Sequence, residues 1–109
     1  MQTIDLPFRI FKTDGVFHKA FAEIMGFPGY YGCNWDAWID CMSYIDDPSA
    51  AMTQVSLNEG ELLEFHIVEY EFTEDLDKSD VFRNFFICAG LVNSRFKKRE
   101  CETRLIISN

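Results

Sequence analysis

The stretch from residue 81 to residue 96 places the strongest constraint on the fold. Its apolar residues recur at helical spacing and form one stripe: Phe82, Phe85, Phe86, Ala89, Val92 and Phe96. Such a stripe has to be buried against another layer of structure. Asp77 or Ser79 is expected to cap this helix, and the short apolar run 104–108 (RLIIS) after it indicates a strand buried within a sheet. The C-terminal part therefore predicts a helix packed on a sheet.

The N-terminal part repeats this order of strand and helix. Residues 3–11 (TIDLPFRIF) predict a strand that Pro7 interrupts, as at a sheet edge or a bulge. Thr13 or Asp14 is then placed to cap a helix that runs to about Met25. Strands that alternate with helices indicate an α/β domain, with a small, mainly parallel sheet and helices packed on it.

The middle of the chain predicts a second helix and a hairpin. Asn34 is a good cap for a helix over residues 35–45. The runs MTQVSL (52–57) and ELLEFHIVEYEF (61–72) both alternate apolar and polar residues, and they flank the connection Asn-Glu-Gly. We therefore expect an inserted β-hairpin over about residues 52–70.

Length and composition limit the class of protein. A chain of 109 residues is expected to form one domain, residues 1–109. Hydrophobic residues make up 48% and aromatic residues 16%, which excludes a disordered chain. No apolar run approaches the roughly 18 residues of a membrane span, and the start MQTIDLPFRIF does not resemble a secretory signal. The expected location is the cytoplasm.

The charge is negative and unevenly distributed. The net charge is −8, yet half of the basic residues lie near the C-terminus: Arg95, Lys97, Lys98, Arg99 and Arg104. Such a surface repels nucleic acid and membranes and attracts basic partners, so we expect neither nucleic acid nor membrane binding. The alternative is that the acidic residues only keep the protein in solution.

Residues able to do chemistry are few. The cysteines match no zinc spacing and are expected to be reduced thiols: Cys33, Cys41, Cys88 and Cys101. We expect His18 on the surface of a helix and His66 half-buried on a strand, with no Ser or Cys nucleophile beside either. These patterns predict no enzyme, no metal site and no cofactor.

The second helix has two distinct faces. At 100° per residue, one apolar stripe faces the core: Trp38, Cys41, Met42 and Ile45. Asp36, Asp40 and Ser43 share the opposite face, bordered by Ile39 and Tyr44. Two like charges at this spacing cost a helix a few tenths of a kcal/mol. They are either ordinary surface acids or a binding surface for a basic cleft.

The same segment carries a resemblance to a known family. PGYYGCNWDAWIDCMS resembles the barstar family, which typically shows Pro-x-Tyr-Tyr-Gly-x-Asn-x-Asp-Ala-x-x-Asp here. The matching residues are Pro28, Tyr30, Tyr31, Gly32, Asn34, Asp36, Ala37 and Asp40. The end CETRLIIS also resembles the family's last strand. The resemblance implies a barstar-like fold and a stoichiometric inhibitor that plugs the basic active site of a ribonuclease.

The resemblance also implies roles for single residues. Tyr30 would pack against the nuclease, Asp40 would enter its phosphate-binding pocket, and Ser43 would match a family threonine. With the two residues that border the acidic face, the expected partner-binding set is Tyr30, Asn34, Trp35, Asp36, Ile39, Asp40, Ser43 and Tyr44.

Some positions depart from the family pattern. The tryptophan expected at position 39 is Ile39, with Trp38 one step earlier, and Arg95 and Arg99 occupy a stretch where the family carries acids. These departures indicate a nuclease toxin other than barnase, held by this antitoxin or immunity protein in a 1:1 complex. The alternatives are a barstar-fold interaction module with a non-nuclease partner, and a small enzyme or thiol-based redox protein.

Overall fold

The computed structural model describes residues 1–69 and 79–109. In these ranges the chain forms the following elements in order: β1 (Gln2–Pro7), the 3-10 turn η1 (Phe8–Phe11), α1 (Asp14–Met25), α2 (Trp35–Ser43), the 3-10 turn η2 (Pro48–Ala50), β2 (Leu62–Val68), α3 (Asp80–Lys98) and β3 (Arg104–Ser108). The predicted α/β class is therefore confirmed.

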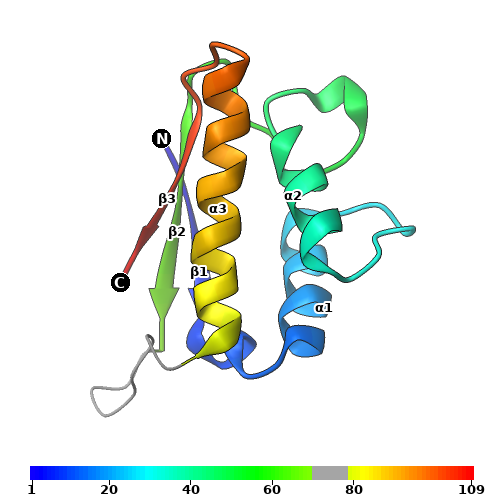
Figure 1. Ribbon diagram of the computed structural model, residues 1–109, viewed down its shortest axis with the longest axis vertical. Coiled ribbons are helices and arrows are strands. Elements are labelled where there is room, and N and C mark those ends of the chain that lie inside the picture. The colour runs from blue at the N-terminus through cyan, green and yellow to red at the C-terminus, as the bar shows by residue number, and fades with distance from the viewer. Residues whose placement is uncertain (70–78) are drawn as a thin grey trace.

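The sheet has three parallel strands in the order β1-β2-β3. Leu63 at the centre pairs with Gln2 on one side and with Leu105 on the other. Parallel neighbours require long crossovers, and the helices provide them. All three helices lie to one side of the sheet (Figure 1). The predicted small parallel sheet with helices packed on it is confirmed.

The predicted β-hairpin over residues 52–70 is wrong in the described part, and residue 70 lies outside the described residues. β2 has β1 on one edge and β3 on the other, so no edge is left for an antiparallel arm. Residues 52–57 instead run along the ends of two helices, where the Gln54 N–H donates to Met25 O at 2.9 Å and the Leu57 N–H to Ile45 O at 2.9 Å. Alternating polarity shows that one face of a strand is buried, but it does not show which strand lies beside it.

The last strand was predicted to lie inside the sheet, but β3 is an edge strand. Its Leu105 is buried, whereas Ile106 points to the other face and is exposed. The break at Pro7 is confirmed, because β1 ends there and η1 begins.

One aromatic cluster joins the sheet to all three helices. Phe65 on β2 lies 5.4 Å from Phe21 on α1 and 5.7 Å from Phe85 on α3, measured between ring centroids. Trp38 on α2 lies 5.6 Å from Phe21 and 5.7 Å from Phe85. All four side chains are fully buried. Burying side chains of this size is the main stabilising term of a small core, and it fixes the inner face of α2.

The helix ends follow the predicted caps. Thr13 Oγ1 accepts the Val16 N–H, Asn34 Oδ1 accepts the Ala37 N–H, and Ser79 Oγ accepts the Phe82 N–H. Asp77, the other candidate cap of α3, lies outside the described residues. α2 ends at Ser43, earlier than the predicted Ile45. No helix in the described part of the chain is both long and apolar enough to cross a membrane.

Candidate functional site

A buried histidine on α1 contacts the loop that precedes α2, residues 26–34. His18 is only 1% exposed, so the expectation of a surface histidine is wrong. Its Nδ1 lies 2.6 Å from the Tyr31 hydroxyl, and its ring packs edge-on against Trp35. Burial lowers the pKa of His18, against the opposing effect of Asp14, and burial raises the pKa of Tyr31. Both groups are therefore neutral near pH 7, and the Tyr31 hydroxyl and His18 Nδ1 share one hydrogen bond.

Tyr30 points away from this anchor. Its side chain is 76% exposed, and its O–H donates only to the sulfur of Met52, at 3.5 Å. Thioether sulfur is a weak acceptor. The aromatic ring and most of the hydrogen-bonding capacity of Tyr30 are therefore accessible at the surface.

The first turn of α2 separates the predicted contacts at the helix start. Asn34 is exposed, but its Oδ1 is occupied by the Ala37 N–H at 2.8 Å. Trp35 is half-buried, stacks on Phe17 at 4.7 Å and donates to Asp14. Asp36 is exposed and lies in the first turn, where the helix dipole favours a negative charge. Of these three residues, Asp36 is therefore the one that presents a charge to a partner.

Asp40 lies one turn further along α2 and has a cation beside it. Its side chain is 59% exposed, and its Oδ1 accepts a hydrogen bond from Arg95 Nη1 on α3 at 2.9 Å. The same nitrogen of Arg95 lies 3.4 Å from Ser43 Oγ. The acidic face of α2 is therefore partly neutralised by the chain itself.

Ile39 and Ser43 do not lie on the exposed face, so their predicted exposure is wrong. Ile39 is 8% exposed and Ser43 is 4% exposed, and the Ser43 hydroxyl donates to Ile39 O at 2.6 Å. The helical wheel assigned only one buried stripe to α2. In the fold, α3 runs beside α2 and covers a second flank (Figure 1). A helix between two neighbours buries more than one stripe.

A second ion pair holds the C-terminal end of α2. Arg99 Nη2 donates to Ser43 O and to Asp46 Oδ1, both at 3.1 Å, and the guanidinium group lies over Phe96. With the pair described above, this gives what we call the α2–α3 clasp, formed by Asp40–Arg95 and Asp46–Arg99. The sequence did not predict the clasp. The spacing of Arg95 and Arg99, one helical turn apart, indicates that the two side chains share one face, but it does not specify Asp40 or Asp46 as their partners.

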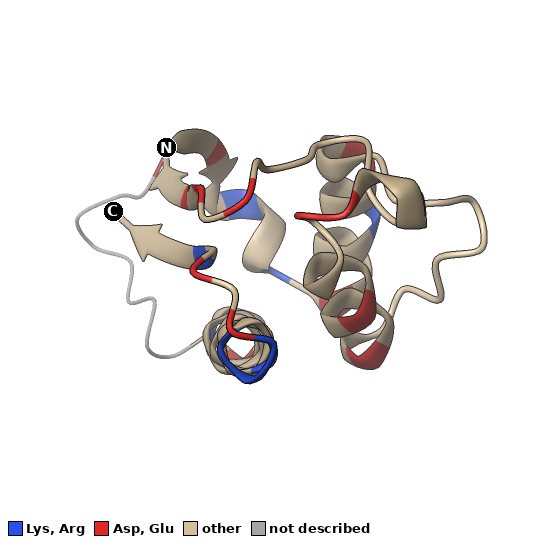
Figure 2. Cartoon of the chain, turned by 90° about the horizontal axis from the view of Figure 1, so that it is seen from above, with Lys and Arg blue, Asp and Glu red and all other residues tan. Residues whose placement is uncertain are grey.

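A small pocket opens beside the clasp. It has a volume of about 240 Å³ and is lined by Ser43, Tyr44, Arg95, Lys98 and Arg99. The predicted contact residue Tyr44 is 42% exposed at this place. Figure 2 looks down on the C-terminal end of α3 and shows the Lys and Arg residues gathered there, with Asp and Glu on the neighbouring helices. Acidic and basic surfaces therefore adjoin at the outer side of α2.

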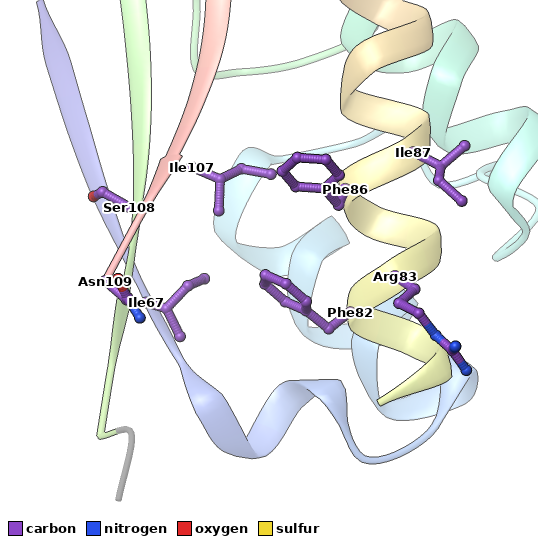
Figure 3. Close-up of a pocket in the computed structure, with 8 residues that line it drawn as sticks. All are labelled: Ile67, Phe82, Arg83, Phe86, Ile87, Ile107, Ser108 and Asn109. Atoms are coloured by element: carbon purple, nitrogen blue, oxygen red, sulfur yellow. The ribbon is translucent and has the colours of Figure 1, made fainter. Parts of the chain in front are cut away.

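The larger cavity lies elsewhere. An open pocket of about 500 Å³ lies between the C-terminal ends of β2 and β3 and the first half of α3 (Figure 3). Its lining is mostly apolar and comprises Ile67, Phe82, Arg83, Phe86, Ile87, Ile107, Ser108 and Asn109. Arg83 pairs with Asp80 on its own helix. No residue of α2 reaches this cavity.

A polar row crosses the sheet face turned away from the helices. Asp5, His66 and Ser108 are register partners on the three strands, and His66 Nδ1 lies 3.1 Å from Ser108 Oγ. His66 is half-buried, as predicted, and makes no hydrogen bond to Asp5 in the described structure. Nucleophilic catalysis requires an oriented base and donors for an oxyanion. The row is better explained as ordinary cross-strand pairing.

Two cysteines, Cys41 and Cys88, are buried in the core. Burial raises the pKa of the Cys41 thiol to about 11 and also raises the pKa of Cys88. Protonated thiols are poor nucleophiles, which argues against a redox role for these two. Among the residues that the structure describes, no group of His, Cys, Asp or Glu side chains is arranged to hold a metal ion.

The comparisons with known proteins agree with the geometry of α2 and its loop. The family model described as Barstar (barnase inhibitor) matches residues 1–86, well over half of the chain. No curated protein sequence matches the chain closely enough to be compared. The matched range contains α1, the loop, α2 and β2, and it ends before Arg95, Lys98 and Arg99.

Proposed function

We propose, because the chain belongs to the barstar family, that it is an antitoxin or immunity protein that occludes the basic active site of a ribonuclease-type toxin with α2 and the preceding loop. A member of this family is a barnase-inhibitor-like protein, and the family consists of inhibitors rather than enzymes. The resemblance seen in the sequence at residues 28–40 is therefore confirmed at the level of the family. The identity of the target and the mode of occlusion are the proposal.

The observation that carries the proposal is the exposed acidic row on α2. Asp36 and Asp40 lie one turn apart, and both are exposed. Nucleases bind phosphate groups with Arg and Lys side chains, and a carboxylate forms short, charge-assisted hydrogen bonds with the same groups. The net charge of −8 also speeds encounter with a basic partner.

The fold supports this role because it presents α2 as a rigid element. The inner face of the helix is fixed by Trp38 and Met42, both fully buried, and its two ends are held by the Asn34 cap and by Arg99. A surface that is ordered before binding loses less entropy when it binds. We expect one such surface per chain, a 1:1 complex, and action in the cytoplasm, where a toxin would meet its inhibitor.

The first test is neutralisation of a nuclease. The protein encoded next to this chain's gene is expressed with and without this chain, and RNA cleavage is measured with the purified pair. Inhibition should be complete at one equivalent. If the neighbouring protein is not toxic, or stays toxic when this chain is present, the proposal loses its support.

The second test concerns the site. We expect Asp40→Ala to weaken the complex by at least about 2 kcal/mol, roughly thirty-fold in Kd, which is the general threshold for interface hot spots; barnase and barstar are themselves a standard example of that class. Asp5→Ala is the matched control, since it removes an exposed carboxylate from the sheet face away from the helices. Equal effects of the two variants would reduce the role of α2 to general electrostatics.

One observation favours the alternative of an interaction module with a non-nuclease partner. Arg95 already occupies one oxygen of Asp40, so the face is less anionic than the sequence alone indicates. A partner with mixed charge would then fit as well as a basic cleft. Binding of a neighbouring protein without any inhibition of RNA cleavage would select this alternative.

A further inference from the structure

We infer that the pocket formed by Ser43, Tyr44, Arg95, Lys98 and Arg99, named here the cationic pocket, receives a carboxylate side chain of the protein partner. The partner would then present an acidic residue beside the basic groups that meet Asp36 and Asp40. That this partner is a ribonuclease rests on the proposed function. The carboxylate site itself rests only on the pocket.

The pocket carries more positive than negative charge. Three cationic side chains line it, but only Arg95 and Arg99 have carboxylate partners, Asp40 and Asp46. Lys98 makes no ion pair with any residue that the structure describes. The pocket therefore keeps one uncompensated positive charge, and one further carboxylate would balance it.

The two arginines of the pocket keep unused hydrogen-bond donors. A guanidinium group carries five N–H donors. Arg95 uses one terminal nitrogen toward Asp40 and Ser43, and Arg99 uses one terminal nitrogen toward Ser43 O and Asp46. The remaining donors of both groups, with the Lys98 ammonium, are available to an acceptor in the pocket. A carboxylate, with two oxygens in one plane, matches such donors better than a single neutral acceptor does.

The surroundings of the pocket favour a single carboxylate over a nucleic acid. Acidic groups lie beside the pocket, because Asp40 pairs with Arg95 and Asp46 pairs with Arg99. At physiological salt, charges act over about 8 Å, so a polyanion would meet these carboxylates as well as the pocket. A volume of about 240 Å³ accepts one side chain. One acidic side chain brings a single negative charge, which balances the charge of Lys98.

The inference also explains how a partner engages Asp40. When a basic group of the partner binds this carboxylate, Arg95 loses its present counter-ion. A cation left without a partner in an interface is costly. A carboxylate of the partner placed in the cationic pocket replaces the lost ion pair. Binding is then an exchange of ion pairs, in which neither Asp40 nor Arg95 stays unpaired.

The first experiment needs no nuclease. The peptide triglutamate is titrated into the labelled protein at low salt, with triglutamine at the same ionic strength as the neutral control, and NMR follows the side-chain signals of Arg95 and Arg99. We expect saturable shifts with triglutamate only. Lys98→Ala should weaken this binding at least threefold, whereas Lys97→Ala should change it by less than half.

Lys97 is a close control for Lys98. It is the adjacent residue on α3, it is exposed and carries the same charge, and it does not line the pocket. Equal effects of both variants would show diffuse attraction and overturn the inference. Tighter binding of inorganic phosphate or of a short oligonucleotide than of triglutamate would also overturn it, because the site would then select a different anion.

The second experiment uses the ribonuclease that this chain inhibits in the neutralisation test. If the partner supplies a carboxylate to the pocket, Arg95→Ala weakens the complex about tenfold. If α2 is only an acidic plug, the same variant strengthens the complex, because it removes a competitor of the nuclease for Asp40. If no ribonuclease is inhibited, the proposed function fails, and the peptide titration still decides on the pocket.

Discussion

Trp38 permits a sharp test of what holds α2 in place. Its side chain is fully buried, with the rings of Phe21, Phe85 and Trp35 at centroid distances of 5.6, 5.7 and 6.0 Å. Truncating an aromatic residue in such a site costs about 3–5 kcal/mol. The indole Nε1 is also buried, and it has no hydrogen-bond partner among the described residues. An unsatisfied buried donor of this kind costs about 1–3 kcal/mol.

These two terms predict different outcomes for two variants. Trp38→Ala should lower the free energy of unfolding by about 3–5 kcal/mol, since the ring contacts are lost and a cavity remains. Trp38→Phe also removes apolar contact, but it removes the unsatisfied N–H as well. Because these contributions have opposite signs and similar size, we expect Trp38→Phe to stay within about 1 kcal/mol of the parent protein.

Urea unfolding followed by circular dichroism measures both values. Fluorescence is less suitable because the substitution removes one of the two tryptophans. For a domain of this size the melting temperature of Trp38→Ala should fall by more than about 10 °C. A loss above about 2 kcal/mol for Trp38→Phe would show that the indole N–H makes a valuable hydrogen bond. A loss below about 2 kcal/mol for Trp38→Ala would show that this ring does not anchor α2.

Three further predictions concern the surroundings of the site. Arg99→Ala should lower the free energy of unfolding, measured in urea, by about 1–2 kcal/mol at low salt. The loss should be smaller at high salt, because the side chain is 42% exposed and its ion pair is screened. The control Lys98→Ala should change the free energy of unfolding by no more than about 0.5 kcal/mol. Burial lowers the pKa of His18, so the unfolded chain binds a proton more strongly than the folded chain does. The free energy of unfolding should therefore be highest above about pH 6.5 and should fall as the pH drops below that value. His18→Gln should make the free energy of unfolding depend less on pH between about pH 8 and 5. Gly26→Ala should lower the free energy of unfolding by more than about 1 kcal/mol in the same assay. Gly26 has a φ of 69°, and a Cβ at this position would lie 2.6 Å from Gln54 Cβ. An unchanged urea midpoint would contradict that geometry.

The predictions that the structure confirms are those set by local chemistry. A cap such as Thr13 or Asn34 acts on an N–H three residues away, and an apolar stripe acts through one helical period. Both features can therefore be recognised directly in the sequence. The buried positions of Trp38, Cys41, Met42 and Ile45 follow from the same period.

The order of the strands in the sheet cannot be recognised from the sequence in this way. Leu63, Phe65 and Ile67 are buried at alternate positions, which any strand with one face on the core would show. The sequence placed this strand in a hairpin because a short Gly-containing connection precedes it. The segment 52–57 before that connection instead forms hydrogen bonds at the ends of two helices, from Gln54 to Met25 and from Leu57 to Ile45. Only the folded chain brings these groups together.

The candidate site was predictable as a segment but not as a charge distribution. The family pattern located α2 and its loop, and Tyr30, Asp36 and Asp40 are indeed exposed. The pairing of Asp40 with Arg95 joins residues on different helices, and nothing in the helical period of either one specifies the other. Yet this pairing decides what a partner meets. An isolated acidic helix favours a cationic cleft, whereas the inference drawn from the cationic pocket implies a partner surface that offers a cation to Asp40 and a carboxylate to Arg95.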